Sequence, residues 1–433
     1  MNKLFLIFFI FILLQNCSLN DNSKFWNEDA KKIESKNKSK TLKFLSDKNL
    51  ESEQNPNLRL NFKTQVRFDN ERYKLNNNSG NYNFDGNLEI QSKYKFSKID
   101  KLINYEPKIV SSRDDLVFFE KKGAIFKLDK ELKLLWKKNF YTKSEKKIRP
   151  ILKLNIKDNI IIVADNISKY YALDLNSGNL IWMKRNDAPF NSEIKFYKNS
   201  FLVADYNNVL RCFDIKNGNE KWNLKTDNNF IKSNKVLSMV IIQDKVFFSN
   251  SLGDISAVDV RNGELLWQLP TQNSLLFDNS FTLRTSSLIA DDFNLYFSNN
   301  RNQFFSINTK NGTLNWRKKI NSDITPISID DYLFTISIAG SLIILDKKNG
   351  KVVKSKKILN TDSKNKNIIK PVGFKIGLSK IYISLDNGRI IIVDLKSGNQ
   401  LAKIKIGSRK ISEPFIVNKN LYVLKNNSII KLR

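Results

Sequence analysis

The chain alternates short apolar runs with turn-forming residues along most of its length. Runs such as 245–249, 294–298 and 380–384 are rich in β-branched and aromatic residues, which favour strands. Each run leads through a turn of the type Asp386-Asn-Gly388 into a second apolar run. The second run ends at an aspartate or asparagine, often followed by Asn-Gly or Ser-Gly, which marks another tight turn. The pattern predicts antiparallel strands joined by short hairpins.

These hairpins belong to a repeat with a fixed phase. Four copies carry an acid or amide, then glycine four positions later and tryptophan eight positions later: Asp174, Gly178 and Trp182; Asp214, Gly218 and Trp222; Asp259, Gly263 and Trp267; and Asn308, Gly312 and Trp316. Two further copies carry Lys354 or Ala402 at the tryptophan position. A degenerate copy joins Asp129 to Trp136, and the last copy stops at Arg433. Successive phase positions lie 38–49 residues apart, a period typical of one four-stranded propeller blade.

Eight phase positions predict an all-β fold, an eight-bladed β-propeller of four-stranded blades over residues 101–433. The last repeat ends at its third strand, and an open ring would expose a strand edge there. The alternating stretch 87–96, within an N-terminal segment 58–100, is the natural fourth strand, so we expect the ring to be closed by it. Tyr94 is expected to take the missing tryptophan position.

The repeated aspartate, glycine and tryptophan are interpreted as structural rather than ligand-binding. Glycine tolerates a positive φ in the turn, and the aspartate side chain can accept backbone N–H bonds across it. Each indole is expected to dock between neighbouring blades, where burying roughly 200 Å² stabilises the ring by about 5 kcal/mol. Cys212 lies beside one of these strands and is interpreted as a small buried hydrophobe.

The composition argues against an enzyme. Histidine is absent, which removes the commonest general base and most zinc and nucleophile arrangements. The two cysteines, Cys17 and Cys212, cannot form a disulfide framework or a Cys-x-x-Cys centre, and the chain has no glycine-rich phosphate loop. We therefore expect no catalytic residues, no metal site and no cofactor.

The net charge of +30 comes from 73 Lys and Arg against 43 Asp and Glu. Such an excess is compatible with nucleic acid, an anionic membrane or an acidic partner. The lysines are scattered as singles and pairs, without the aromatic-interleaved stretch of a nucleic-acid binder. We interpret the charge mainly as compositional drift, with an anionic membrane face as the functional alternative and no nucleic acid.

The N-terminus predicts an exported protein. Residues 4–14 form an apolar run after Lys3, too short to span a bilayer and typical of a signal peptide, which we place at 1–16. The following Cys17 resembles the lipidated cysteine of a bacterial lipoprotein box, although Asn16 replaces the usual small residue. An uncleaved anchor or a non-lipidated signal remain alternatives. Residues 17–57, rich in Lys, Asn and Ser, are expected to be a lipidated flexible tether.

Across residues 85–433 the repeats resemble those of quinoprotein-type, or PQQ-like, propellers. With a lipoprotein signal and eight blades, the chain is most similar to the BamB family, lipoprotein subunits of the outer-membrane β-barrel assembly machine. Ser18, rather than aspartate, follows the cysteine, which favours the outer membrane. The resemblance implies a non-enzymatic, monomeric scaffold on the periplasmic face. Its implied partners are BamA, the other subunits of the machine and nascent outer-membrane proteins.

Two segments resemble the surface with which BamB proteins contact BamA. Phe281-Thr-Leu283-Arg284 matches the family's Leu-Ser-Leu-Arg, and the stretch from Asn321 through Asp323 to Pro326 matches its Asp-x-Asp-Thr-Thr-Pro. Asn321 replaces the first acid of that motif. Both segments lead into first strands of successive blades, so we expect their side chains to share one end of the ring. The alternative is that Phe281 and Leu283 are core residues and Arg284 a solvated charge.

Two other classes remain open. A quinone-dependent dehydrogenase shares the propeller, but such enzymes carry a calcium-binding carboxylate set and often an adjacent cysteine pair, neither of which the sequence offers. A periplasmic module that binds glycans or cell-wall material is the third class. Only the assembly-factor interpretation predicts an association with BamA.

Overall fold

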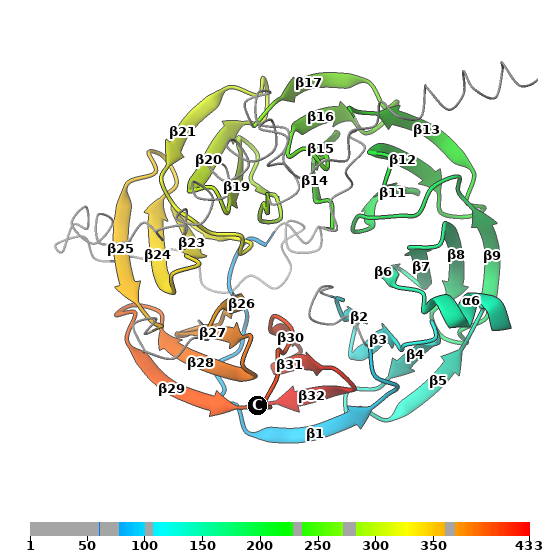
Figure 1. The fold of residues 1–433 in the computed structure, drawn as a ribbon, viewed down its shortest axis with the longest axis horizontal. Helices are drawn as coiled ribbons and strands as arrows, with labels where there is room; N and C mark the ends of the chain where they lie inside the picture. Colours follow the sequence, from blue (N-terminus) through cyan, green and yellow to red (C-terminus); the bar gives the residue numbers. More distant parts are fainter. Residues whose placement is uncertain (1–59, 61–77, 100–106, 228–235, 272–282, 360–368) are drawn as a thin grey trace, which may run out of the picture. The chain divides into compact units, whose positions relative to one another are not determined.

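A computed structural model describes residues 60, 78–99, 107–227, 236–271, 283–359 and 369–433. The chain divides into two units, Met1–Ser46 and Asp47–Arg433, and all described residues belong to the second. Within this unit eight four-stranded antiparallel sheets are arranged as a ring (Figure 1). The predicted eight-bladed propeller is confirmed.

Seven blades are meanders of consecutive strands, numbered here in chain order. Blade 1 comprises β2 (Val110–Ser112), β3 (Asp115–Phe119), β4 (Ile125–Leu128) and β5 (Leu134–Lys138). Blade 2 comprises β6 (Leu152–Lys157), β7 (Ile160–Asp165), β8 (Lys169–Asp174) and β9 (Leu180–Arg185). Blade 3 comprises β10 (Lys195–Tyr197), β11 (Ser200–Ala204), β12 (Val209–Asp214) and β13 (Glu220–Lys225). Blade 4 comprises β14 (Met239–Ile242), β15 (Lys245–Ser249), β16 (Ile255–Asp259) and β17 (Leu265–Leu269).

The second half of the ring continues the same order. Blade 5 comprises β18 (Ile289–Ala290), β19 (Asn294–Asn299), β20 (Gln303–Asn308) and β21 (Leu314–Lys318). Blade 6 comprises β22 (Ile327–Ile329), β23 (Tyr332–Ile336), β24 (Ser341–Asp346) and β25 (Val352–Lys357). Blade 7 comprises β26 (Pro371–Ile376), β27 (Lys380–Leu385), β28 (Arg389–Asp394) and β29 (Gln400–Lys405). Blade 8 comprises β30 (Phe415–Val417), β31 (Asn420–Lys425), β32 (Ser428–Leu432) and the early strand β1 (Ile90–Lys95).

The middle strands are apolar on both faces because each blade packs against two neighbours. In β7 five successive residues are buried, and in β23 four. The outer strands differ: β9 and β29 are largely exposed and carry lysines. The core therefore lies between the blades, at about the middle of each sheet.

The indole of one blade lies on the turn glycine of the next. A Cβ built on Gly263 would lie 2.7 Å from an indole carbon of Trp222, whose Nε1 donates to the carbonyl oxygen of Val260 at 3.1 Å. The same pairing joins Trp136 to Gly178, Trp182 to Gly218, Trp267 to Gly312 and Trp316 to Gly350. Glycine is thus required for two reasons. The turn has a positive φ, +81° at Gly263, and the neighbouring indole fills the space that a side chain would need.

The junction from blade 6 to blade 7 lacks this contact. Lys354 stands at the tryptophan position, and its Nζ donates to the carbonyl oxygen of Lys396 at 2.6 Å. The turn glycine of blade 7, Gly398, has a φ of +72°, but the nearest atom to a Cβ built there is the Cβ of Lys356, at 3.5 Å. Lysine therefore supplies the hydrogen bond without filling the space that an indole would occupy.

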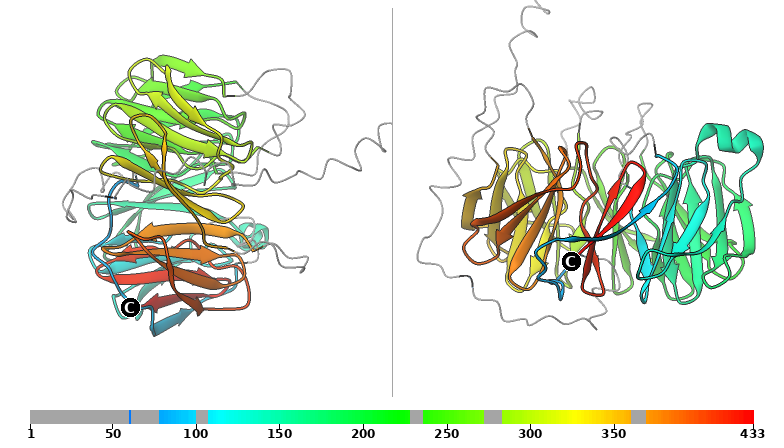
Figure 2. Two further views of the ribbon diagram at one scale, coloured as in Figure 1. Left: turned by 90° about the vertical axis from the view of Figure 1, so that its left-hand side faces the viewer. Right: turned by 90° about the horizontal axis from the view of Figure 1, so that it is seen from below.

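The strand β1 closes the ring by pairing with β32 in antiparallel register. Glu89 and Arg433 exchange two backbone hydrogen bonds, of 2.7 and 3.0 Å, so the chain's C-terminus lies beside β1 (Figure 1). The right-hand view of Figure 2 shows β1, in blue, in front of the red strands of blade 8, on the outside of the ring. The strand predicted to close the ring does so.

The expected role of Tyr94 is wrong. In the other blades the tryptophan position pairs with the residue two before the phase position, as Trp222 does with Cys212. By this rule the equivalent residue in β1 is Ser92, which pairs with Lys431. Tyr94 pairs with Ile429, two residues further along, and its ring packs 5.1 Å from that of Phe126. The repeat spacing could not be counted here because the two halves of this blade lie at opposite ends of the chain.

The segment before β1 lies against the inner strands of two blades. Gly80 donates its backbone N–H to the carbonyl oxygen of Ser328 in β22 at 2.7 Å, and Tyr82 donates to Ile376 of β26 at 2.8 Å. Further on, the ring of Phe84 packs 5.0 Å from that of Tyr382 in blade 7. In Figure 1 the blue trace accordingly runs from the centre of the ring to β1 at its rim.

The short helix α6 (Lys143–Ile148) joins blades 1 and 2 and was not anticipated from the sequence. Thr142 and Glu145 form a capping box that satisfies free N–H groups at the start of the helix. Glu145 also binds Lys169, at 2.9 Å, and Arg185. Burial raises the pKa of Glu145, but its hydrogen bonds to Lys169, to the Thr142 backbone and to Arg185 outweigh burial and lower that pKa to about 2.

A matched pair of substitutions measures the indole contact. Gly263→Ala and Gly398→Ala both place a Cβ at positive φ, which costs about 1–2 kcal/mol, but only Gly263→Ala drives it into an indole. We expect Gly263→Ala to lower the free energy of unfolding by about 1–3 kcal/mol more than Gly398→Ala, measured by urea denaturation. Equal losses would show that the turn conformation alone requires the glycine.

A deletion tests the closure of the ring. Removing residues 86–99 leaves β32 as an unpaired edge and takes the rings of Tyr94 and Phe96 from the core beside blade 1. We expect the cooperative thermal transition, followed by circular dichroism, to be lost or strongly broadened. A variant lacking residues 20–46, which belong to the other unit, is the control and should melt as the full chain does. An unchanged transition after removal of 86–99 would refute the closure.

Candidate partner-binding face

The residues singled out from the sequence fall into two groups. Cys17 and Phe281 lie outside the described residues. Leu283, Arg284, Asn321 and Asp323 are described, and all four lie in the connections that lead into blades 5 and 6. The structure therefore permits a direct test of whether the two segments lie together.

The two connections are joined through the turn that follows β19. Arg284 donates its backbone N–H to the side-chain oxygen of Asn300 at 2.8 Å and accepts the Asn300 N–H at 2.9 Å. Thr285 bridges Asn299 in antiparallel fashion, and Asn299 bridges Asn321 in parallel fashion. Three backbone segments thus lie edge to edge on one end of the ring, as the positions of the two motifs predicted.

This arrangement brings the charged residues of the two motifs together. The Arg284 Nε lies 3.3 Å from the Asp323 Oδ2, and the two side chains are 57% and 24% exposed. An ion pair this accessible contributes at most about 1 kcal/mol to stability. Both groups consequently stay available for contact with another molecule at little cost to the fold.

Leu283 and Asn321 face inward. Leu283 is only 5% exposed, which favours the alternative that it is a core residue over a role as an apolar anchor for a partner. The Asn321 carbonyl oxygen accepts the Ile338 N–H at 2.8 Å. The Asn321 side-chain oxygen is buried and has no hydrogen-bond partner among the described residues. Of the four described residues, Arg284 and Asp323 are the charged ones, and both side chains are accessible to solvent.

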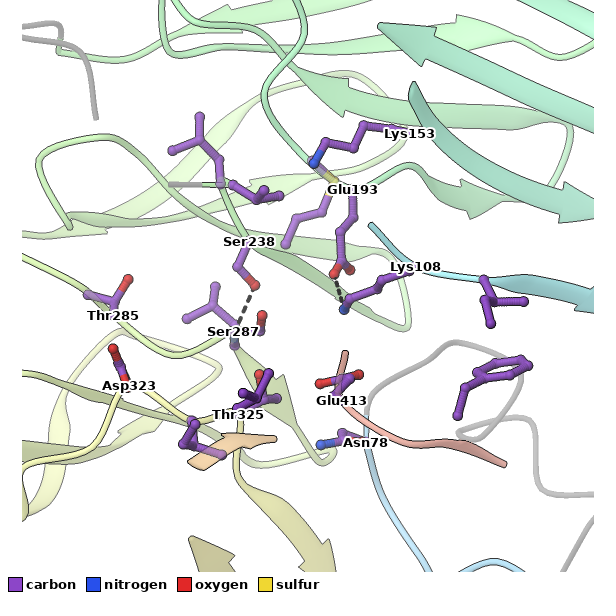
Figure 3. A pocket seen from close by; sticks show the side chains of 18 of the residues that line it. Asn78, Lys108, Lys153, Glu193, Ser238, Thr285, Ser287, Asp323, Thr325 and Glu413 are labelled. Atoms are coloured by element: carbon purple, nitrogen blue, oxygen red, sulfur yellow. Dashed lines mark hydrogen bonds and ion pairs between the residues drawn. The ribbon is translucent and has the colours of Figure 1, made fainter. Parts of the chain in front are cut away.

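The same end of the ring opens into the central channel. A cavity of about 1360 Å³ lies inside the starts of the innermost strands, and Leu283, Arg284 and Asp323 are on its wall. Asn78, from the segment before β1, also lines it; Figure 3 shows Asn78, Lys108, Glu193 and Glu413 around the open space. The candidate face and the mouth of the channel are thus one continuous surface.

Charged side chains line the channel in groups. Glu193 pairs with Lys108 and, at 3.4 Å, with Lys195 (Figure 3 shows the first pair). Burial raises the pKa of Glu193, but Lys108, Lys195 and Lys153 outweigh burial and bring that pKa well below its usual range. Burial lowers the pKa of Lys195, an effect that Glu193 opposes. The local potential is therefore positive.

A second group lines the same cavity. Lys375 pairs with Glu413 at 3.4 Å, and the side chain of Asn78 accepts a hydrogen bond from Lys375 at 3.3 Å. Burial disfavours the charged lysine, but Glu413 raises the pKa of Lys375 above its usual value. The second group thus pairs one lysine with one carboxylate beside the segment that carries Asn78.

The described residues contain no cluster of metal-ligating side chains. Among residues 78–99, 107–227 and the later described ranges, no group of three or more His, Cys, Asp or Glu side chains is placed to hold an ion. Cys212 is buried in blade 3, and burial raises its thiol pKa to about 11. Within the same ranges no helix is long and apolar enough to cross a membrane.

The charges in the channel were not anticipated from the sequence, although a signal for them was present. Prolines mark the beginning of the innermost strand in several repeats, and charged residues flank them: Lys108 follows Pro107, and Glu413 precedes Pro414. Lys370, before Pro371, also lines the cavity. The innermost strands of a propeller line its channel. Once the repeat is recognised as a propeller blade, a charged residue beside this proline is therefore expected to lie at the channel.

Comparison with known proteins yields one family and several relatives. The family model described as "Outer membrane protein assembly factor BamB" matches residues 121–356. A curated outer membrane protein assembly factor BamB from Francisella salina is 28% identical over 139 residues, which are 30% of this chain and 24% of that protein. The chain is thus aligned with about a quarter of that relative's length.

Solved structures show the same fold at low identity. BamB from Moraxella catarrhalis superposes with a TM-score of 0.64 and 15% identity, covering 80% of this chain and 99% of that one. The quinohemoprotein alcohol dehydrogenase from Comamonas testosteroni superposes with a TM-score of 0.60 and 10% identity, covering 80% and 76%. At these identities the superpositions establish the propeller and nothing about activity.

Proposed function

The chain belongs to the family of the outer membrane protein assembly factor BamB, and from this we propose that it is a non-enzymatic periplasmic scaffold of the outer-membrane β-barrel assembly machine that binds BamA. The other subunits of the machine and nascent outer-membrane proteins are its further proposed partners. The observation that carries the proposal is the ion pair of Arg284 and Asp323, which unites two segments that resemble the family's contact surface.

The contact surface is assigned residue by residue. Arg284 and Asp323 are the side chains that a partner can reach, and Arg is favoured at the centre of protein interfaces. Leu283 supports the surface without contacting the partner, because its burial holds the Arg284 backbone against the Asn299–Asn300 turn. Asn321 contributes its backbone to the same small sheet. Phe281, next to this segment in sequence, belongs to the proposed surface but lies outside the described residues.

A quinone-dependent dehydrogenase is the weaker candidate. Its support is the fold shared with the quinohemoprotein alcohol dehydrogenase. In this chain the carboxylates Glu193 and Glu413, at the channel, are paired with lysines, a poor starting point for a calcium site. No observation favours a glycan-binding module.

The proposal includes a lipid anchor at Cys17, which places the ring on the periplasmic face of the outer membrane. Its support is the apolar run and the cysteine in the sequence, together with membership of a family described as an outer membrane protein assembly factor. Residues 1–16 are proposed to be removed as a signal peptide and 17–57 to act as the tether.

Charge reversal tests the contact surface. Arg284→Glu places like charges opposite a partner that complements arginine, and we expect BamA recovered in a detergent pull-down to fall at least tenfold, a loss of about 1.4 kcal/mol. The control is Arg317→Glu, an equal change of charge on the exposed outer strand of the same blade. Full recovery of BamA with Arg284→Glu would remove this residue from the interface.

The lipid anchor has its own test. Cys17→Ser is expected to abolish incorporation of labelled palmitate and to move the protein from the membrane fraction to the periplasmic extract. A protein that stays in the membrane fraction and was never labelled would instead be held by an uncleaved N-terminal anchor. Labelling that persists in Cys17→Ser would exclude Cys17 as the lipidated residue.

A further inference from the structure

The channel mouth carries more positive than negative side chains. Its wall contains eight lysines and arginines against two aspartates and two glutamates, an excess of four positive charges among the described residues. The overall charge of +30 leads one to expect cations on any exposed surface. An excess inside a concave wall is different, because low-dielectric walls concentrate the field of charges that converge on one space.

The four carboxylates of the mouth are already engaged. Glu193, Glu413 and Asp323 pair with cations of the wall, as described above. Asp386 accepts the backbone N–H of Lys370 at 3.0 Å. The excess is therefore not cancelled within the wall.

Two of the cations gather beside one turn. Lys370 precedes β26 and is held to the Asp386 turn through its backbone. Arg409 lies on the other side of this turn, since a Cβ built on Gly388 would lie 2.6 Å from the Arg409 carbonyl oxygen. Both side chains are exposed, and neither forms an ion pair with any described residue. They extend the positive wall that begins deeper in the channel at Lys375 and Lys108.

The shape of the site fits an extended chain rather than a small ion. The cavity of about 1360 Å³ exceeds the roughly 300–1,000 Å³ typical of small-molecule pockets. The channel already holds one extended segment of this chain, which pairs through Asn78 and Gly80 with Ser328 of β22. The cations are spread along the wall from blade 1 to blades 7 and 8, so they match charges that are themselves spaced along a backbone.

We propose that the mouth of the channel binds an extended acidic peptide segment of another protein, whose carboxylates are held by Lys370, Arg409 and the lysines deeper in the channel. This goes beyond the scaffold role, because it assigns a ligand chemistry to the channel whichever protein supplies the segment. Arg284 and Asp323 lie on the rim of the same cavity, so a partner docked on that face has direct access to it.

The test uses the purified full chain and a rhodamine-labelled decaglutamate peptide, with decaglutamine as the uncharged comparison. Binding is followed by fluorescence polarisation at 50 and 200 mM salt. The informative variant is Lys370→Glu/Arg409→Glu. Its control, Lys403→Glu/Lys405→Glu, makes the same change in net charge on the exposed outer strand of the same blade. Thermal melting of both variants by circular dichroism establishes that they remain folded.

We expect decaglutamate to bind, decaglutamine not to bind, and the affinity for decaglutamate to fall at least tenfold in Lys370→Glu/Arg409→Glu while the control keeps it within twofold. An equal loss in both variants would show attraction by overall charge and overturn the proposal. Displacement by a few millimolar inorganic phosphate at constant ionic strength would also overturn it, since it would reveal an adventitious anion site only. The assay contains no BamA, so its failure leaves the scaffold proposal standing.

Discussion

The ring depends on the contact between an indole and the turn glycine of the next blade. The contact joins a tightly packed apolar face to a directional hydrogen bond, as Trp222 does with Gly263 and Val260. The contact has the same direction at the five junctions where it occurs, from blade 1 through to blade 6. Each blade is then stabilised by contacts with its two neighbours alone, as in other repeat proteins.

Three consecutive junctions lack the indole. The N-terminal segment packs against this part of the ring. The tryptophan position holds Lys354 in blade 6, Ala402 in blade 7 and Ser92 in blade 8. Residues 78–89 run past these blades, and Phe84 and Leu88 enter the core formed by blades 7 and 8. The Tyr382 hydroxyl donates to the Gly86 carbonyl oxygen at 2.9 Å. The N-terminal segment thus adds apolar contacts and a hydrogen bond at blades 7 and 8.

The fold could be predicted largely from the sequence because its information is repeated. One spacing, read at Asp214, Gly218 and Trp222, fixes strands, turns and blade number wherever it recurs. Errors arose where the repeat could not be counted. Tyr94 was placed two residues off because β1 has no phase position before it, and the helix α6 was missed because it lies between repeats.

Only part of the candidate face could be predicted from the sequence. That Arg284 and Asp323 share one end of the ring follows from their equivalent places in two repeats, and the structure joins them. The burial of Leu283 could not be inferred, because an apolar residue beside a strand suits a core and an interface equally well. The charges of the channel depend on side chains from blades far apart in the sequence, such as Lys375 and Lys108, meeting around one axis.

The closure of the ring also constrains when the molecule can be completed. Ile90 pairs with Leu432, 342 positions later in the numbering, so β1 cannot complete its sheet until β32 has been synthesised. Contacts of such long range carry a large entropic cost and form slowly. Until the final residues arrive, β1 remains an unpaired strand on a basic chain, exposed to chaperones and to proteolysis. A chain truncated before β32 therefore leaves β1 without the strand that it pairs with.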